Sequence, residues 1–381
     1  MNNSSFDFAQ DKNTINQQLR VIISGGGTGG HIFPAISIAN AIKRLHADAQ
    51  ILFIGALGRM EMQRVPDAGY EIKGLPIMGF DRKHLLKNII VLYKVYKSQR
   101  MAKKIIKDFK PDVVVGVGGY ASGPTLNQAA AMGIPCLIQE QNSYAGVTNK
   151  LLAKKVAKVC VAYDGMERFF PADRIIMTGN PVRQALFETT ITKADAKKSF
   201  GLNPDKAVIL FVGGSLGART INESILGHID MIKNLDVQVI WQTGKYYSRE
   251  IHDKLKDETI PNLHVTDFIK DMGVAYKAAD LVVSRAGASS ISEFCLLGMP
   301  VILVPSPNVA EDHQTKNAMA LVNKDAALYV KDIEAKDVLL DLAIKTVADK
   351  SRLCALSENI KKLALPDSAG IIAQEVIKLR N

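Results

Sequence analysis

The sequence predicts an α/β protein made of two Rossmann-like domains in tandem. Short β-branched runs alternate with longer helical patterns along most of the chain, which is typical of strand–helix–strand units around a parallel sheet. Two of these runs, at 19–24 and 207–212, lead directly into a glycine-rich loop and then a helical pattern. The length of 381 residues agrees, because a domain commonly holds roughly 100–200 residues.

Each half contains five candidate strands. Those of the first half are Leu19–Ser24, Ile51–Ile54, Asp112–Val115, Pro135–Ile138 and Val159–Ala162. Those of the second half are Ala207–Val212, Val237–Trp241, Leu263–Val265, Leu281–Ser284 and Val301–Val304. Helices are expected over 32–45, after the first glycine loop, and over 368–380, at the end of the sequence. Gly179 and Pro181 punctuate the chain between the halves, so we expect the domain boundary at 178–183.

The composition is that of an ordinary globular protein, with 47% hydrophobic and 23% charged residues. No stretch approaches the ~18–20 apolar residues that a membrane span needs. The polar residues 1–18 lack the apolar core of a signal peptide and are expected to form a disordered extension. These features argue against an integral membrane protein and a secreted one, and favour the cytoplasm.

Most of the net charge of +10 lies in one segment. Ten lysines and arginines stand against two aspartates between residues 81 and 110, and apolar residues are interleaved with them from Ile77 onward. One interpretation is a solvated helix with a single apolar face in the core. The other is a dock for an anionic membrane surface, formed by the basic amphipathic region 77–107. Nucleic acid is disfavoured as a partner because no recognised binding motif accompanies the charge.

The first glycine loop matches the pattern G-x-G-x-x-G through Gly25, Gly27 and Gly30. Such a loop brings backbone N–H groups and a helix N-terminus close to a diphosphate. A dinucleotide site would also need an acid near position 55, where this chain has "GALGR", so NAD is disfavoured and Arg59 leaves NADP as an alternative. His31 follows the loop at the first helical turn. It is either a structural histidine or a general base, since the ordinary pKa of histidine lies near neutrality.

Five further loops follow strands and open helices, so we expect them at the same sheet edges. In the first half these are "GVGGYASGP" from Gly116 and "QEQNSYAGVTNK" from Gln139, whose amides and carboxylate suit sugar hydroxyls. In the second half they are "GGSLGART" from Gly213, "SRAGASSISEF" from Ser284 and "EDHQTKNA" from Glu311. A cation, helix N-termini, a carboxylate and amides together suit a nucleoside diphosphate sugar.

Taken in order, the motifs "GGGTGGHIFPA", "GVGGYASGP", "QEQNSYAGVTNK", "TGNPVR", "GGSLGA", "SRAGASSISEF" and "HQTKNA" strongly resemble the MurG family of bacterial glycosyltransferases. The resemblance covers nearly the whole chain after residue 19. It implies transfer of N-acetylglucosamine from UDP-N-acetylglucosamine to the C4 hydroxyl of MurNAc in undecaprenyl-diphospho-MurNAc-pentapeptide (lipid I), which gives lipid II for peptidoglycan. It also implies the GT-B architecture, in which two Rossmann-like domains face each other across a cleft.

The same resemblance divides the chain by task. It implies an N-terminal acceptor and membrane-associating domain over 19–182, a C-terminal UDP-sugar donor domain over 183–365, and a closing helix over 366–381 that packs back onto the first domain. It implies a peripheral location on the cytoplasmic side of the inner membrane, with cell-wall and division proteins as partners. No cofactor and no metal is expected, because no D-x-D motif stands beside a glycine loop.

By motif, the resemblance also assigns residues to two groups of contacts. The UDP-N-acetylglucosamine site would include Thr28, Gly29, Gly30, Asn142, Arg183, Ser215, Ile269, Arg285, Ala288, Ser289, Ser290, Ile291, Ser292, Glu293 and Gln314. The acceptor diphosphate would meet the loops that hold Gly26, Gly27, Gly118, Gly119 and Tyr120. Glu293 would hold the ribose hydroxyls, the backbone at Ile269 the uracil, and Gln314 the sugar.

The reaction that the resemblance implies inverts the anomeric centre. His31 would take the proton from the acceptor hydroxyl as its oxygen attacks from the face opposite UDP, with Glu140 and Asn142 as further catalytic candidates. Helix N-termini, Ser215, and Arg183 or Arg285 would neutralise the leaving diphosphate. The alternative function is a UDP-sugar glycosyltransferase of the same fold that uses another lipid acceptor, such as diacylglycerol.

Overall fold

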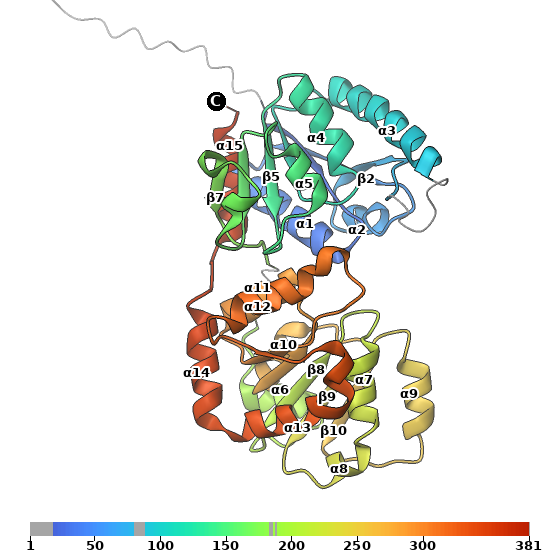
Figure 1. Ribbon diagram of the computed structural model, residues 1–381, viewed down its shortest axis with the longest axis vertical. Helices are drawn as coiled ribbons and strands as arrows, with labels where there is room; N and C mark the ends of the chain where they lie inside the picture. The colour runs from blue at the N-terminus through green and yellow to red at the C-terminus, as the bar shows by residue number, and fades with distance from the viewer. Residues whose placement is uncertain (1–17, 80–87, 183–185, 187–188, 381) are drawn as a thin grey trace, which may run out of the picture.

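Two parallel β-sheets with helices on their faces form the two halves of the molecule (Figure 1). The computed structural model describes residues 18–79, 88–182, 186 and 189–380. The seven-stranded sheet of the first half has the order β3-β2-β1-β4-β5-β6-β7, and the six-stranded sheet of the second half has the order β10-β9-β8-β11-β12-β13. Because the strands pair in parallel throughout these two sheets, the predicted α/β class with two Rossmann-like halves is confirmed.

The strands of the first sheet are β1 (Arg20–Ser24), β2 (Gln50–Ala56), β3 (Glu71–Leu75), β4 (Val113–Gly116), β5 (Cys136–Glu140), β6 (Lys158–Val161) and β7 (Ile175–Met177). Those of the second sheet are β8 (Val208–Val212), β9 (Gln238–Gln242), β10 (Leu263–Thr266), β11 (Leu281–Ser284), β12 (Val301–Leu303) and β13 (Leu328–Tyr329). All ten strands expected from the sequence are present to within about two residues at either end.

The α-helices before the boundary are α1 (Gly29–Leu45), α2 (Glu61–Asp67), α3 (Asn88–Phe109), α4 (Ser122–Ala131) and α5 (Val147–Leu152). Those after it are α6 (Lys193–Ser199), α7 (Arg219–Leu226), α8 (Ile229–Lys233), α9 (Ser248–Leu255), α10 (Met272–Ala278), α11 (Ala288–Leu297), α12 (His313–Val322), α13 (Ala335–Ala348), α14 (Lys350–Lys361) and α15 (Ser368–Lys378).

Three strands, β3, β7 and β13, were not expected from the sequence, and all three lie at sheet edges. The run "EIKGL" of β3 alternates exposed and half-buried residues, so it lacks the apolar run of a central strand. β7 and β13 hold only three and two residues, which is too short for any periodicity to show.

The core of the first half is completed by the last helix of the chain. β1 places Val21 and Ile23 on one face of its sheet, where they pack with Ile38 of α1. Ile372 and Val376 of α15 are fully buried in the same cluster. α15 therefore lies against the first half, beside α1, although it follows the whole second half in sequence (Figure 1).

Gly179, in the motif "TGNPVR", lies beside the segment that leads from the second half into α15. Its φ is +79°, and a Cβ there would meet Ser368 Oγ at 2.5 Å and Leu365 Cβ at 2.6 Å. A side chain at 179 would be strained by its backbone and would clash with the segment that leads into α15. The motif thus has a packing reason in addition to marking the boundary.

The two halves meet through the loops at the carboxyl ends of their strands. α11 and α12 of the second half lie between the two sheets (Figure 1). Asn180, which follows β7, donates a hydrogen bond to Ser292 Oγ of α11 at 3.0 Å. Parallel strands bring all such loops of a sheet to one edge, so the two edges that carry the motifs face each other.

Candidate active site

The two glycine loops of the first half pack against each other. A Cβ at Gly25 would meet Val117 Cγ2 at 2.2 Å, and a Cβ at Gly119 would meet the Gly26 carbonyl oxygen at 2.4 Å. Gly119 also has a φ of +83°. Glycine is therefore needed at 25 and 119 so that the backbones can approach, whether or not a ligand is bound.

His31 lies over the second of these loops, at the start of α1. Thr28 precedes the helix as its N-cap, and Gly29 and Gly30 form its first two positions. A Cβ at Gly118 would come within 2.9 Å of the His31 ring. Tyr120, further along that loop, is half exposed and lies against Gly79, where a Cβ would meet its hydroxyl at 2.3 Å.

The tautomer of His31 is fixed by Gln141. His31 Nδ1 lies 2.9 Å from Gln141 Oε1, while Gln141 Nε2 donates to the Val117 carbonyl at 2.9 Å. Since the amide nitrogen is turned to a carbonyl, its oxygen faces the ring, and Nδ1 must carry the proton. Nε2 of His31 then holds the free lone pair. Burial lowers the pKa of His31, an effect that the charge on Glu140 partly offsets, so the ring is neutral at pH 7.

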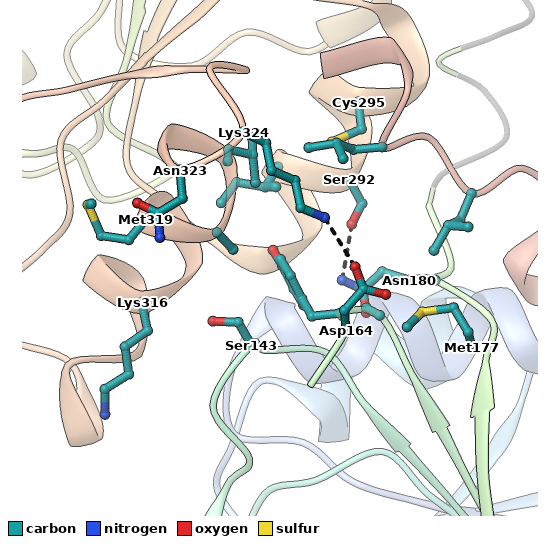
Figure 2. Close-up of a pocket in the computed structure, with 18 of the residues that line it drawn as sticks. Ser143, Asp164, Met177, Asn180, Ser292, Cys295, Lys316, Met319, Asn323 and Lys324 are labelled. Carbon is teal, nitrogen blue, oxygen red and sulfur yellow. Dashed lines mark hydrogen bonds and ion pairs between the residues drawn. The ribbon is translucent and has the colours of Figure 1, made fainter. Parts of the chain in front are cut away.

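A chain of buried amides runs from Gln141 to the second half. Gln141 donates to the Gln139 side-chain oxygen, and Gln139 Nε2 donates to Asn180 Oδ1 at 2.9 Å. Asn180 Nδ2 donates in turn to the Gln141 carbonyl at 3.0 Å. It also donates to Ser292 Oγ at 3.0 Å, the contact drawn in Figure 2. Sequence reasoning grouped Gln141 with amides that suit sugar hydroxyls and gave no role to Asn180, because the partners of both lie far away in the chain.

Glu140 has its carboxylate occupied by its own loop. It is 1% exposed, and its oxygens accept from the backbone N–H groups of Asn142 and Gly146, each at 3.0 Å. Asn149 Nδ2 adds a bond of 2.9 Å and Asn142 Nδ2 one of 3.3 Å. This geometry fits a carboxylate that shapes the loop after β5, whereas the free lone pair of His31 fits a base.

Glu61 is a site residue that sequence reasoning missed. It is 1% exposed, and its carboxylate accepts from the backbone N–H of Gly27 at 2.8 Å and of Ala56 at 3.0 Å. Residues 55–59 contain no acid, as the sequence analysis noted. The acid at the end of β2 comes instead from α2, which returns Glu61 to that point. One N–H of the loop expected to meet a diphosphate is thus already bound to a carboxylate.

The donor-side residues line the facing edge. Ser215 is exposed in a loop that Gly214 and Gly217 turn with φ of +85° and +91°. Glu293 is buried on α11, where Tyr276 donates to its Oε2 at 3.1 Å. Ile269 is buried as well.

The first turn of α11 contains Ala288, Ser289 and Ser290. The Ser289 hydroxyl is buried and has no hydrogen-bond partner among the described residues. The side chain of Ile291 belongs to the core, so only its backbone can reach a ligand. Gln314, on α12, accepts from the Ser306 N–H at 2.8 Å through Oε1.

Arg285 is used within the fold. Its guanidinium forms an ion pair with Asp332 and donates to the carbonyls of Val304 and Pro305 at 3.0 and 3.3 Å. The expected role as a free cation for the diphosphate conflicts with this network, because sequence shows the charge but not its partner. Arg183, the other cation expected there, lies outside the described residues.

A cavity of about 700 Å³ lies between the halves, beside the hydrogen bond that joins Asn180 to Ser292 (Figure 2). Ser143 and Asn180 line it from the first half, and Ser292 and Lys324 from the second. Lys324 forms an ion pair of 3.1 Å with Asp164 across it. The glycine loops at 24–31 and 213–217 do not line it, so it is distinct from the edge that holds His31 and Ser215.

Comparison with protein-family models gives two matches in the order of the halves. Residues 21–161 match the glycosyltransferase family 28 N-terminal domain, and residues 208–372 match the glycosyltransferase family 28 C-terminal domain. The chain belongs to glycosyltransferase family 28.

Relatives within this family are similar over almost their whole length. The chain is 69% identical to a protein of Bacteroides thetaiotaomicron over 95% of this chain and 98% of that protein, and 68% identical to one of Bacteroides fragilis over 95% and 96%. Both are named UDP-N-acetylglucosamine--N-acetylmuramyl-(pentapeptide) pyrophosphoryl-undecaprenol N-acetylglucosamine transferase. The crystal structure of Acinetobacter baumannii MurG has a TM-score of 0.75 at 29% identity, covering 94% of this chain and 99% of that one. The MurG resemblance and the GT-B fold are confirmed.

The contact of Glu61 with the glycine loop is testable. In Glu61→Gln the amide can accept one of the two backbone N–H groups but leaves the other without a partner. A buried unpaired donor costs about 1–3 kcal/mol, so we expect the free energy of unfolding in urea to fall by that amount. Hydrogen exchange at the Gly27 amide should also become faster.

Glu71→Gln is the matched control, because Glu71 is an exposed acid on the adjacent β3. It should change neither quantity. Equal stability and equal Gly27 exchange in Glu61→Gln and the unmodified protein would show that the carboxylate does not hold the loop.

Proposed function

We propose that this chain is an inverting glycosyltransferase that moves N-acetylglucosamine from UDP-N-acetylglucosamine to the C4 hydroxyl of MurNAc in lipid I, giving lipid II. The observation that carries this is 68% identity, over 95% of the chain, to the Bacteroides fragilis transferase of that name. The geometry supports it, because a neutral histidine lies on one sheet edge and a glycine-headed loop with a buried carboxylate on the facing one.

We assign the donor to the second half. Glu293, beside Tyr276, holds the ribose hydroxyls, and the backbone at Ile269 meets the uracil. Gln314 keeps its amide nitrogen for the sugar, since Ser306 occupies only its oxygen. These roles agree with a carboxylate accepting two hydroxyl donors and an amide donating to a hydroxyl oxygen.

The chemical step then needs one proton transfer and one displacement. Nε2 of His31 takes the proton of the C4 hydroxyl while that oxygen bonds to the anomeric carbon from the face opposite UDP. The bond to the UDP oxygen breaks with its electron pair, so an α-linked donor becomes a β-linked product. Backbone N–H groups at the N-termini of α7 and α11, with Ser215 and Ser289, stabilise the diphosphate, because Arg285 is held by Asp332.

We also propose that α3 docks on an anionic membrane from the cytoplasmic side. Among the described helices, none is both long and apolar enough to cross a bilayer. Ile90, Leu92, Tyr93 and Tyr96 at the start of α3 are all more than half exposed, so the core does not absorb these four, although it buries Ile106 further along the helix. Part of the basic region, residues 80–87 with Arg82, Lys83 and Lys87, lies outside the described residues. Exposed apolar and basic side chains together favour the surface of a bilayer over bulk water.

The activity is tested with the purified full chain, radiolabelled UDP-N-acetylglucosamine and a short-chain lipid I analogue. We expect label in a lipid II analogue and one UDP released per transfer, with and without chelator. Diacylglycerol is offered in parallel as the competing acceptor. Transfer to diacylglycerol but not to the lipid I analogue would overturn the assignment in favour of another lipid acceptor.

His31→Ala should lower kcat by about 10²–10⁴-fold, the usual contribution of a general base, while the Kd for UDP stays within about twofold. The pKa of His31 lies below the ordinary value of 6.5, so its basic form persists at mildly acidic pH. The acid limb of the kcat/KM profile should therefore fall below pH 6.5. His46→Ala, in the C-cap of the same helix, is the control. An unchanged kcat, or an acid limb above 6.5, would remove His31 as the base.

Reversing two exposed charges of α3 in Lys97→Glu/Lys104→Glu should weaken binding to phosphatidylglycerol-containing vesicles. Each lysine near such a surface contributes about 1 kcal/mol, so the affinity should fall tenfold or more in co-sedimentation. Lys256→Glu/Lys350→Glu changes the net charge equally on the second half and should bind as the unmodified protein does. Equal loss in both variants would mean that net charge, and not α3, drives binding.

A further inference from the structure

Asn317 of α12 joins the two halves through one buried amide. It is 0% exposed, and its Oδ1 accepts from Ser143 N at 2.9 Å and from Ser143 Oγ at 3.0 Å. Its Nδ2 donates to Asn142 Oδ1 at 3.1 Å and to the Ala286 carbonyl at 3.4 Å. The side chain thus bridges the loop after β5 in the first half and the loop after β11 in the second.

These four contacts fix which way the amide points. The Ser143 N–H can only donate, so the atom that faces it is the oxygen of Asn317, and the Ala286 carbonyl can only accept, so the nitrogen faces it. Asn142 must then present its own oxygen to Asn317. Its nitrogen turns to Glu140, 3.3 Å away, and one N–H of Asn142 is left for a ligand.

The other contacts that described residues make between the halves, including Lys150–Glu311 at 3.6 Å and Lys316 Nζ at 3.3 Å from the centre of the Tyr144 ring, do not touch Asn142. The pair Lys324–Asp164 is at least half exposed on both sides, and such pairs contribute about 0–1 kcal/mol. Asn180 reaches Ser292 but bonds the Gln141 carbonyl, not Asn142. An unpaired buried amide costs more than a surface ion pair contributes, so Asn317 ties the orientation of Asn142 to contact between the halves.

We propose that Asn317 is a positioning residue for the transfer reaction. It holds Asn142 in a single orientation at the junction of donor and acceptor, and it does so only when the two halves are together. The inference rests on the proposed function, since the family resemblance places Asn142 in the donor site and among the catalytic candidates. Removing Asn317 should therefore impair turnover without impairing capture of the nucleotide, which the second half binds by itself.

The first experiment compares Asn317→Ala with Asn317→Asp in the full chain. Asn317→Asp keeps the volume and the oxygen that faces Ser143 but turns a second oxygen toward Asn142 Oδ1 and the Ala286 carbonyl. Because misplacing a catalytic group by about 1 Å can cost about 100-fold, we expect both variants to lower kcat at least tenfold. The Kd for UDP should stay within about twofold. Asn323→Ala, an exposed asparagine directly after α12, is the matched control and should keep full activity.

The second experiment is a double-mutant cycle with Asn142→Ala. If Asn317 acts through Asn142, adding Asn317→Ala to Asn142→Ala should lower kcat by less than threefold more, whereas independent effects multiply. Full multiplication, or an unchanged kcat in both single variants, would overturn the proposal. Loss of UDP binding in Asn317→Ala would mark a folding defect. In that case the kcat of Asn317→Asp, which keeps the core filled, decides whether Asn317 is needed for turnover.

A readout that needs no turnover separates this inference from the proposed function. Hydrogen exchange of the peptide spanning 141–146 should become at least tenfold faster in both Asn317 variants, while the peptide spanning 20–31 stays unchanged. If the unmodified protein forms no lipid II analogue, the proposed function fails. The exchange result still decides whether Asn317 orders this loop, and equal exchange in all proteins would overturn that.

Discussion

The parallel direction of every strand pair in both sheets is the constraint on which the rest of this structure depends. It brings the glycine-rich and amide-rich loops of each half to one edge of its sheet. The last helix, α15, follows the second half in sequence but packs on α1 and completes the core of the first half. The two edges then face each other. Residues as distant in sequence as Asn142 and Asn317 lie in hydrogen-bond contact for this reason.

Hydrogen bonds and paired charges organise this junction. The carboxylates of Glu61 and Glu140 are both buried and accept backbone N–H groups, and Arg285 is held by Asp332. Buried charges are tolerated when they are paired or fully hydrogen-bonded, and these are. What faces the cleft is a neutral imidazole, amides and hydroxyls. A diphosphate in such a site is stabilised by oriented dipoles at helix N-termini, which need no reorganisation when charge develops.

The parts of this architecture that local sequence determines could be predicted, and those that depend on distant contacts could not. The ten strands other than β3, β7 and β13 follow from apolar runs, and the place of His31 follows from a glycine loop between a strand and a helix. Edge strand β3 was not predicted because its exposed residues are polar and interrupt the apolar run. Glu61 and Asn180 were not singled out, and Gln141 and Asn317 were expected only as ligand amides, because their partners stand up to 175 residues away. Arg285 was assigned to a ligand because its charge is visible in the sequence while Asp332, its partner, is not recognisable as such.

The amide chain from Gln141 to Ser292 also limits what could happen to the proton that His31 would take up in the proposed reaction. Gln141, Gln139 and Asn180 transmit orientation, because each amide fixes the direction of the next, but an amide does not accept a proton near neutral pH. In that reaction the proton on Nε2 would leave on the side where it arrived, to solvent or to the departing UDP. The charge of Glu140 would stabilise the imidazolium in the interval, since it acts on the ring from within a loop that keeps both carboxylate oxygens bound. Gln141 and Val117, both in the first half, thus fix how His31 is presented, and the amide chain links Gln141 to Ser292 of the second half.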